Sequence, residues 1–300
     1  MIYFPLMKTE FDLSMYRRSL HHSAKQQPED GDIWSFDAPY YKAHETGSYD
    51  DFFRPLLQSE GCMFFEELLV AQKNIGLSTH VLDLFGGGFF LENLDSVDSI
   101  TGVRLQNPTE EMFPWLEEQK TQPNLSEHYK TVTIPYTINR LQTLTASPKW
   151  SIVEGNLFTQ DTWNKLDKQG EQKGITDYSL ITIKPESALY TDAIFDSQDI
   201  WKRYGNEKVN QVYSLKYLQL LDRSYSRLSG NHGMLFTEVP EFLAGDYLDG
   251  FVDTIKTGTN IGIDVMNSIY DPKRKNMLLH KQPDSPRHLA RTVRDRYRAA

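Results

Sequence analysis

Three consecutive glycines follow an acidic residue in the run Asp83-Leu-Phe-Gly86-Gly87-Gly88. They come directly after a short apolar segment, in the setting of a turn that leads from a strand into a helix. Glycines in such a turn let the backbone approach a ligand closely. A carboxylate at Asp83 would repel a diphosphate at that range, so the turn favours a ligand that carries positive charge and no phosphate.

Charged side chains at the ends of later apolar segments are candidates for proton transfer. Lys184 and Glu186 follow the apolar segment 178–183. A carboxylate there could accept the proton that a hydroxyl, amine or acid loses as it reacts. Glu238 and His232, which flank a later apolar segment, are weaker candidates. The alternative for each of these side chains is a polar group in solvent at the end of a strand.

From residue 78 onward, short apolar segments alternate with helical periodicity, the pattern of a parallel sheet with crossover helices. The predicted strands are 80–84, 99–103, 150–153, 178–183 and 233–237, and the predicted helices are 110–118, 159–169 and 206–228. Two further strands, 260–270 and 276–281, are joined by a short polar connection and should form an antiparallel hairpin. This order predicts an α/β fold with a doubly wound, mostly parallel sheet and a C-terminal hairpin.

The pattern divides the chain into three parts. These are a helical N-terminal extension or cap (1–75), a core that contains the pattern (76–282) and a basic C-terminal helix (283–300). An apolar stripe from Phe52 to Ala71 predicts one broad helix that leads into the first strand. The connection 119–147 is longer than the fold needs, and its residues 131–136 are either an added strand or part of an interface. Aromatic residues in 187–205 and 34–41 indicate either a cover over a ligand or packing on the core.

Together these segments resemble the class I methyltransferases, which use S-adenosylmethionine, over roughly residues 47–282. The resemblance lies in the order and spacing of the first motif at 83–88, the second strand and following helix at 100–112, the third strand and its turn at 152–158, the fourth strand and active-site motif at 178–186, and the helix, turn and fifth strand at 220–236. S-adenosylmethionine carries a sulfonium and an ammonium but no phosphate, which agrees with an acid at Asp83. The resemblance implies this cofactor and a Rossmann-like fold of class I methyltransferase type.

By this resemblance, the cofactor lies against the glycine turn, the end of the second strand and the turn after the third strand. The implied cofactor-binding residues are Asp83, Phe85, Gly86, Gly87, Gly88, Arg104, Asn156 and Leu157. Methyl transfer is an in-line displacement, so the acceptor must be held in line with the methyl group. The implied catalytic residues are Glu186 as the base with Lys184 beside it, and the implied acceptor is a small molecule or a protein.

Several residues depart from the family's pattern at positions expected to contact the cofactor. Phe85 and Phe89 stand where the family has the first and third glycines of its motif. Asn156 replaces a common aspartate that accepts a hydrogen bond from the adenine amine of the cofactor, but the side-chain carbonyl of Asn156 can still accept that bond. Arg104 stands where the family has an acid that accepts hydrogen bonds from the ribose hydroxyls, and a guanidinium has no acceptor.

Two interpretations of Arg104 remain open. It could point away while a neighbouring acid binds the ribose, or it could mark lost cofactor binding in a methyltransferase-like binding or scaffold protein. An arginine here would also suit the 2′-phosphate of NADP, but Asp83, the terminal hairpin and the lack of a G-x-G-x-x-G motif in the sequence disfavour an oxidoreductase. The run Lys184-Pro-Glu-Ser187 lacks the Asn/Asp-Pro-Pro-aromatic signature of enzymes that methylate the exocyclic amines of bases.

The net charge of −9 is divided unevenly along the chain. Residues 271–300 contain nine basic and three acidic residues, a net +6, which leaves −15 on residues 1–270. An acidic body repels polyanions, so a broad nucleic-acid-binding face is not expected there. The basic end should be a helix that starts at Ser285-Pro286 and places Arg287, Arg291, Arg294 and Arg298 on one face. That helix either docks on the body or on a second copy in a homodimer, or contacts RNA, an acidic protein or a membrane surface.

The composition gives weaker evidence on the location of the protein and on metal binding. No apolar run in the 300 residues approaches the ~18 to 20 that span a bilayer, and the first residues lack the basic segment of a secretory signal. The single cysteine, Cys62, cannot form an internal disulfide and lies on the apolar stripe as a small hydrophobe. No sequence spacing indicates a metal site. These features lead us to expect a cytoplasmic protein without a metal.

Overall fold

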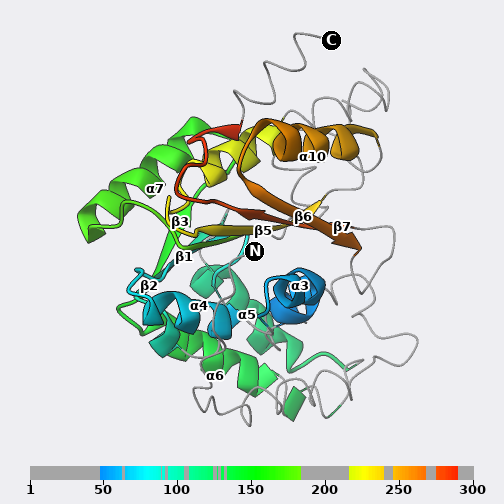
Figure 1. The fold of residues 1–300 in the computed structure, drawn as a ribbon. Coiled ribbons are helices and arrows are strands. Elements are labelled where there is room, and N and C mark those ends of the chain that lie inside the picture. The colour runs from blue at the N-terminus through cyan, green and yellow to red at the C-terminus, as the bar shows by residue number, and fades with distance from the viewer. Residues whose placement is uncertain are drawn as a thin grey trace, which may run out of the picture.

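A single mixed sheet organises the chain in the computed structural model. The structure describes residues 48–62, 65–88, 90–91, 94–104, 108–123, 127, 130–131, 134–183, 216–239, 246–267 and 275–289. The strands are β1 (His80–Leu84), β2 (Ser99–Arg104), β3 (Trp150–Glu154), β4 (Leu180–Ile183), β5 (Met234–Val239), β6 (Gly262–Asn267) and β7 (Lys275–His280). Their order across the seven-stranded sheet is β3-β2-β1-β4-β5-β7-β6 (Figure 1).

Strands β1 to β5 pair in parallel, whereas β7 pairs antiparallel with both β5 and β6. The prediction of a doubly wound α/β sheet with a C-terminal hairpin is therefore confirmed. The fourth strand is shorter than predicted: Tyr178 forms only an isolated bridge with Leu228. The fifth extends to Val239, since it pairs with β7 along that whole length.

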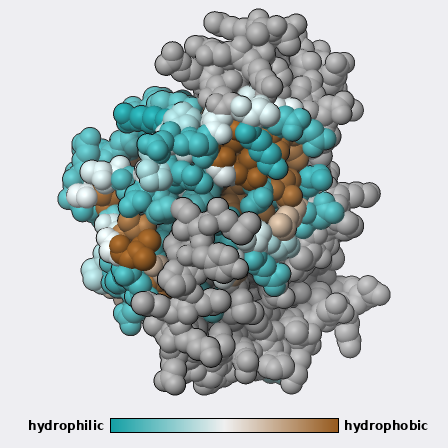
Figure 2. Space-filling model, in the orientation of Figure 1, coloured by the Kyte–Doolittle hydropathy of each residue, from teal (hydrophilic) through white to brown (hydrophobic). Residues whose placement is uncertain are grey.

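Helices cover both faces of the sheet (Figure 1). One face carries α3 (Ser48–Ser59), α4 (Phe65–Asn74), α5 (Pro108–Gln119) and α6 (Ile134–Thr145), and the other carries α7 (Gln160–Lys173), the helix of residues 216–225 and α10 (Asp246–Gly258). Each face buries its own apolar cluster against the strands. Figure 2 shows hydrophobic residues gathered where α10 lies over the hairpin, within mostly hydrophilic surroundings.

Three segments differ between the prediction and the structure. The stripe from Phe52 to Ala71 forms two helices, α3 and α4, and Gly61 lies between them with a φ of 77°. The added strand considered at 131–136 is wrong, because α6 begins at Ile134. Helix α10 was not predicted at all. Both α6 and α10 are amphipathic segments whose apolar faces pack on the sheet.

The segment after the glycine turn also differs from the prediction. A helix was expected to follow the turn, but among the described residues between β1 and β2 only the 3-10 turn η1 (Leu94–Ser96) is helical. The Lys149 ammonium donates hydrogen bonds to the carbonyls of Leu94 (2.6 Å) and Val97 (2.9 Å). This side chain therefore satisfies carbonyls that a longer helix would have bonded internally.

The C-terminal segment is attached to the helix of residues 216–225 and the turn after it. The Lys281 ammonium donates to the carbonyls of Tyr225 (3.3 Å) and Leu228 (3.0 Å), His288 lies 3.4 Å from the Asp222 carboxylate, and Leu289 is 2% exposed within the core. No helix begins at Ser285-Pro286, since residues 283–288 are not helical. The Ser285 hydroxyl instead accepts a hydrogen bond from the Gln282 N–H at 2.9 Å. Arg291, Arg294 and Arg298 lie outside the described residues.

Deletion of residues 284–300 is therefore expected to lower the melting temperature, because it removes buried Leu289 and the contact between His288 and Asp222. Loss of a buried leucine side chain alone costs about 2–5 kcal/mol. Thermal unfolding of the full chain and the deletion variant measures this. A full-length variant with Arg291, Arg294 and Arg298 changed to glutamine removes the charges and keeps the packed residues, so it separates the two contributions to stability. A deletion variant with an unchanged melting temperature would contradict docking of this segment.

His280 gives the fold a predicted acid sensitivity. Its side chain is buried at the end of β7, and its ring centroid lies 5.6 Å from that of His232. Burial lowers the pKa of His280, and the charge of His232 lowers it further. The unfolded chain, with an ordinary pKa near 6.5, thus binds a proton that the folded chain does not, so the free energy of unfolding falls as pH drops below about 6.5.

A His280→Gln variant should therefore lose less stability than the wild type between neutral pH and about pH 5. Thermal unfolding across this range measures the effect. Equal pH dependence of wild type and His280→Gln would assign the acid sensitivity to other groups.

Candidate functional site

Asp83 connects β1, β4 and the glycine turn. Its side chain is 1% exposed, and both carboxylate oxygens accept hydrogen bonds from within the protein. Oδ2 accepts from the Gly88 N–H at 2.7 Å, and Oδ1 accepts from the Thr182 hydroxyl at 2.8 Å. The acid that the sequence predicts beneath the turn thus holds the turn in shape.

The turn lies against β2, and the absence of a side chain at Gly102 permits this. A methyl group at Gly102 would lie 2.8 Å from the Gly86 carbonyl oxygen and 2.9 Å from the Gly87 Cα. Both distances are too short for ordinary contacts. The Phe85 N–H donates to the Val103 carbonyl at 3.0 Å, and the Trp150 indole N–H donates to the Gly87 carbonyl at 2.7 Å. Strands β2 and β3, which lie on one side of β1, therefore both hold the turn.

Phe85 occupies a backbone conformation that favours glycine. Its φ is 69°, in the left-handed region, which costs a residue with a Cβ about 1 kcal/mol or more. This explains why the resembling family has a glycine at this position. The Phe85 side chain is 9% exposed in the core and lies with its ring centroid 6.2 Å from that of Phe158. Apolar burial therefore offsets the strain. Phe89 lies outside the described residues.

The turn after β3 is shaped by Asn156 and by its neighbours on α7. The Asn156 side-chain carbonyl accepts from the Phe158 N–H at 2.9 Å, and its backbone carbonyl accepts from the Thr162 hydroxyl at 2.7 Å. Leu157 is buried, and its carbonyl accepts from the Trp163 indole at 2.7 Å. The predicted adenine acceptor therefore has a partner inside the turn, and that bond helps to define the shape of the turn.

Arg104 ends β2 and is half-buried. In the parallel register it lies opposite Glu154, the last residue of β3, whose side chain is exposed. Glu154 was not among the residues predicted from the sequence, although parallel pairing of the two strands places it beside Arg104. The structure thus provides an acid next to the position where the resembling family has one.

The remaining candidate residues lie at opposite ends of the parallel strands. Glu238 is 5% exposed near the carboxyl end of β5, the same edge as the glycine turn. The Tyr217 hydroxyl donates to the Glu238 carbonyl at 3.2 Å, and burial raises the pKa of Tyr217, so this hydroxyl stays protonated. His232 precedes β5 and lies at the opposite edge, which removes it from the site. Lys184 and Glu186 follow β4 but lie outside the described residues.

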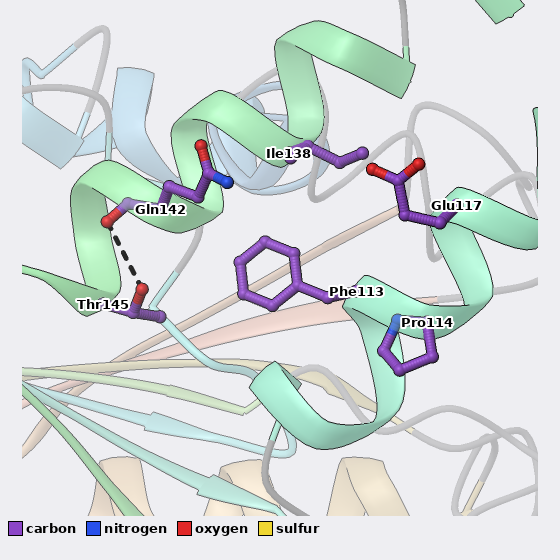
Figure 3. Close-up of a pocket in the computed structure, with 6 residues that line it drawn as sticks. All are labelled: Phe113, Pro114, Glu117, Ile138, Gln142 and Thr145. Atoms are coloured by element: carbon purple, nitrogen blue, oxygen red, sulfur yellow. Dashed lines mark hydrogen bonds between the residues drawn. The ribbon is translucent and has the colours of Figure 1, made fainter.

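A pocket of about 450 Å³ lies between α5 and α6, away from the edge of the sheet that carries the glycine turn. Its lining residues are Phe113, Pro114, Glu117, Ile138, Gln142 and Thr145 (Figure 3). The Glu117 carboxylate is paired with the Lys120 ammonium at 2.8 Å. None of the lining residues belongs to the glycine turn or to the turn after β3, so this pocket is separate from the candidate site.

In the part of the chain that the structure describes, no group of three or more His, Cys, Asp or Glu residues is arranged to hold a metal ion. A helix with the length and apolar character needed to cross a bilayer is likewise missing from the described residues.

No protein-family model matches the chain, and no curated protein matches it. Solved structures to which this chain is similar include an rRNA methylase from Streptococcus thermophilus, which is 10% identical, with coverage of 68% of this chain and 87% of the methylase and a TM-score of 0.34. The N-methyltransferase NodS from Bradyrhizobium japonicum WM9 is 9% identical, with coverage of 73% and 94% and a TM-score of 0.37. An O-methyltransferase from Bacillus cereus, in complex with SAH, is 10% identical, with coverage of 92% and 94% and a TM-score of 0.33.

The strand order of this chain identifies its fold. Dinucleotide-binding Rossmann sheets end in a sixth parallel strand, whereas here an antiparallel β7 lies between β5 and β6. This chain thus combines that hairpin with the parallel strands β1 to β5 and with a glycine turn that follows an acidic residue. The chain therefore has the fold of the class I S-adenosylmethionine-dependent methyltransferases.

Proposed function

We propose that the protein is an S-adenosylmethionine-dependent methyltransferase that acts on a small-molecule or protein acceptor. The observation that carries this proposal is the glycine turn, held over the buried Asp83 carboxylate at the carboxyl end of β1. The chain reverses its strand order between β1 and β4, and open α/β sheets bind ligands at that point. A buried negative charge below the turn suits a cationic ligand better than a phosphate.

The residues present fit this cofactor. Gly86, Gly87 and Gly88 provide a backbone surface without side chains, and Asp83 fixes its shape. Phe85 and Leu157, both buried, would form the apolar base of the site, and Asn156 would shape the turn beside the adenine. Glu154 would accept hydrogen bonds from the ribose in place of Arg104, which then lies at the side of the site.

The bound cofactor would supply the methyl group, and the chain would orient the acceptor and remove its proton. Glu186 is the proposed base, with Lys184 beside it, since both directly follow β4 at the edge where β1 carries the glycine turn. Glu238 lies at the same edge, on the neighbouring strand.

Titration calorimetry with S-adenosylmethionine and S-adenosylhomocysteine tests the proposal. Both should bind, whereas ATP and NADPH should not, because their phosphates would approach the Asp83 carboxylate. Absence of heat with both sulfur ligands at millimolar concentration would contradict the proposed cofactor. Binding of NADPH alone would favour an oxidoreductase.

Glu154→Gln should weaken binding of S-adenosylhomocysteine about tenfold, because a carboxylate accepts stronger hydrogen bonds from the ribose hydroxyls than an amide does. Glu171→Gln on α7 is the matched control, since Glu171 is also exposed and lies away from the turn. Calorimetry measures both variants. Equal affinity in wild type and Glu154→Gln would place the ribose acid elsewhere.

A catalytically degenerate binding or scaffold protein is the second candidate, motivated by Arg104 and by the strained Phe85. Arg104→Asp restores an acid at the family's position and tests it. If the wild type binds neither ligand and Arg104→Asp binds tightly, the degenerate protein is favoured. If the wild type binds and Arg104→Asp binds no more tightly, the enzyme is favoured, because a second carboxylate beside Glu154 adds only repulsion.

A further inference from the structure

One peptide of the glycine turn, between Gly87 and Gly88, is held from both sides by side chains. Its oxygen accepts the Trp150 indole N–H at 2.7 Å, and its N–H donates to the Asp83 carboxylate at 2.7 Å. The other oxygen of Asp83 accepts the Thr182 hydroxyl at 2.8 Å. A hydrogen-bonded chain thus runs from β3 through the turn and β1 to β4.

This chain of bonds crosses β2 at Gly102. The two residues at its ends are on strands that flank β2 and β1, so the turn is fixed relative to four adjacent strands. Thr182 is 0% exposed and Asp83 is 1% exposed, so water cannot easily replace their bond. Both polar groups of the Gly87–Gly88 peptide therefore already have hydrogen-bond partners inside the protein.

We propose that Trp150 and Thr182 are positioning residues for the cofactor: they fix the Gly87–Gly88 peptide, and thereby the surface on which the cofactor lies. This inference rests on the proposed function. Neither residue needs to touch the ligand, because each acts through the turn. A turn fixed before binding loses little conformational entropy on binding, so removal of either bond weakens affinity.

Two variants, each of which removes one hydrogen-bond donor, test the proposal. Trp150→Phe removes the indole N–H and keeps an aromatic ring, and Thr182→Val removes the hydroxyl and keeps the shape. Thr182→Ser restores the hydroxyl and serves as the conservative rescue. Thr101→Val is the matched control: Thr101 is a buried strand threonine, 1% exposed, whose hydroxyl lies 3.2 Å from that of Ser151 and not in this chain of bonds.

Two measurements separate a positioning role from a purely structural one. The first is the dissociation constant of S-adenosylhomocysteine by calorimetry. The second is the hydrogen exchange rate of the Gly88 amide in the ligand-free protein, followed by NMR, because this N–H is the group that the chain of bonds holds. Melting temperatures of all variants report any general loss of stability.

We expect Trp150→Phe and Thr182→Val each to bind about tenfold more weakly and to exchange the Gly88 amide faster. Thr182→Ser should recover most of the affinity, and Thr101→Val should lower the melting temperature without changing either readout. The two substitutions combined should cost less than the product of their separate effects, because both act on one peptide.

The outcomes distinguish this inference from the proposed function. If the wild type binds S-adenosylhomocysteine and both variants bind equally well, the positioning role is overturned and the proposed function stands. If the wild type does not bind, the proposed function fails. In that case the exchange rate of the Gly88 amide still tests whether the chain of hydrogen bonds holds the turn. An exchange rate that is unchanged in both variants overturns that role of the chain.

Discussion

Replacing Gly102 with valine is expected to destabilise the protein by about 2–3 kcal/mol and to abolish binding of S-adenosylhomocysteine. The first atom of the new side chain would lie 2.8 Å from the Gly86 carbonyl oxygen and 2.8 Å from the Ile152 Cδ1. The isoleucine end can move, but the Gly86 carbonyl is backbone and is held by the bonds at Phe85 and Gly87. The turn must therefore leave β2.

Gly230→Val is the matched control, because a Cβ at Gly230 would meet no atom within 4 Å. This variant should have the same free energy of unfolding and the same affinity for S-adenosylhomocysteine as the wild type. Chemical unfolding and calorimetry measure both effects. A Gly102→Val protein that binds S-adenosylhomocysteine normally would show that the turn can detach from β2 without harm to the site, which would contradict a cofactor surface fixed by this contact.

The sheet could be predicted because its central strands are buried on both faces. Every residue of β4 and β5 is buried, as are four of the five residues in β1. Buried parallel strands are nearly continuous apolar runs in sequence, and such runs separated by helical periodicity leave few alternatives to a doubly wound sheet. The hairpin followed from two apolar runs separated by a short polar connection.

Helix α6 was missed because local residue type and apolar spacing conflict at its start. The run Thr131-Val-Thr-Ile134 is β-branched and favours a strand. The apolar residues that follow are spaced for one helical face, and all of them are buried: Ile134, Ile138, Leu141 and Leu144. Packing of this face against the sheet decides the structure, and the first few residues carry little weight in that balance.

The segment after the glycine turn shows a different limit. A helix after such a turn is usual, but here the turn folds back over β2, so that a Cβ at Gly88 would lie 2.3 Å from the Ile100 Cδ1. The turn thus occupies space against β2 that a crossover helix would otherwise cover. Only the contact between the turn and Ile100 of β2 reveals this, and the local sequence does not contain it.

The candidate site was predictable in its backbone and not in its supporting side chains. Asp83 and the glycines share one short run, so their joint role can be inferred from sequence. Thr182 lies 99 residues from Asp83, and Trp150 lies 63 residues from Gly87. Neither residue type is specific for a cofactor site, and only the strand order brings them to the turn.

The sharpest test of Asp83 compares two substitutions. Asp83→Ala should abolish binding of both S-adenosylmethionine and S-adenosylhomocysteine and should cost about 1–3 kcal/mol of stability, because the Gly88 N–H and the Thr182 hydroxyl lose their acceptor. Asp83→Asn can keep both bonds: its oxygen accepts from Gly88, and its amide donates to the Thr182 hydroxyl, which also accepts. The turn therefore survives in Asp83→Asn, and only the negative charge is lost.

The two ligands then report on that charge separately. S-adenosylmethionine carries a sulfonium and S-adenosylhomocysteine does not, so Asp83→Asn should weaken the first about tenfold more than the second. Calorimetry of wild type, Asp83→Asn and Asp83→Ala with both ligands gives the comparison, and thermal unfolding checks that Asp83→Asn keeps its fold. Equal losses for both ligands in Asp83→Asn would mean that the carboxylate acts on the turn alone. Full affinity of Asp83→Ala for both ligands would place the cofactor away from the turn, because neither the charge nor the shape of the turn would then matter to binding.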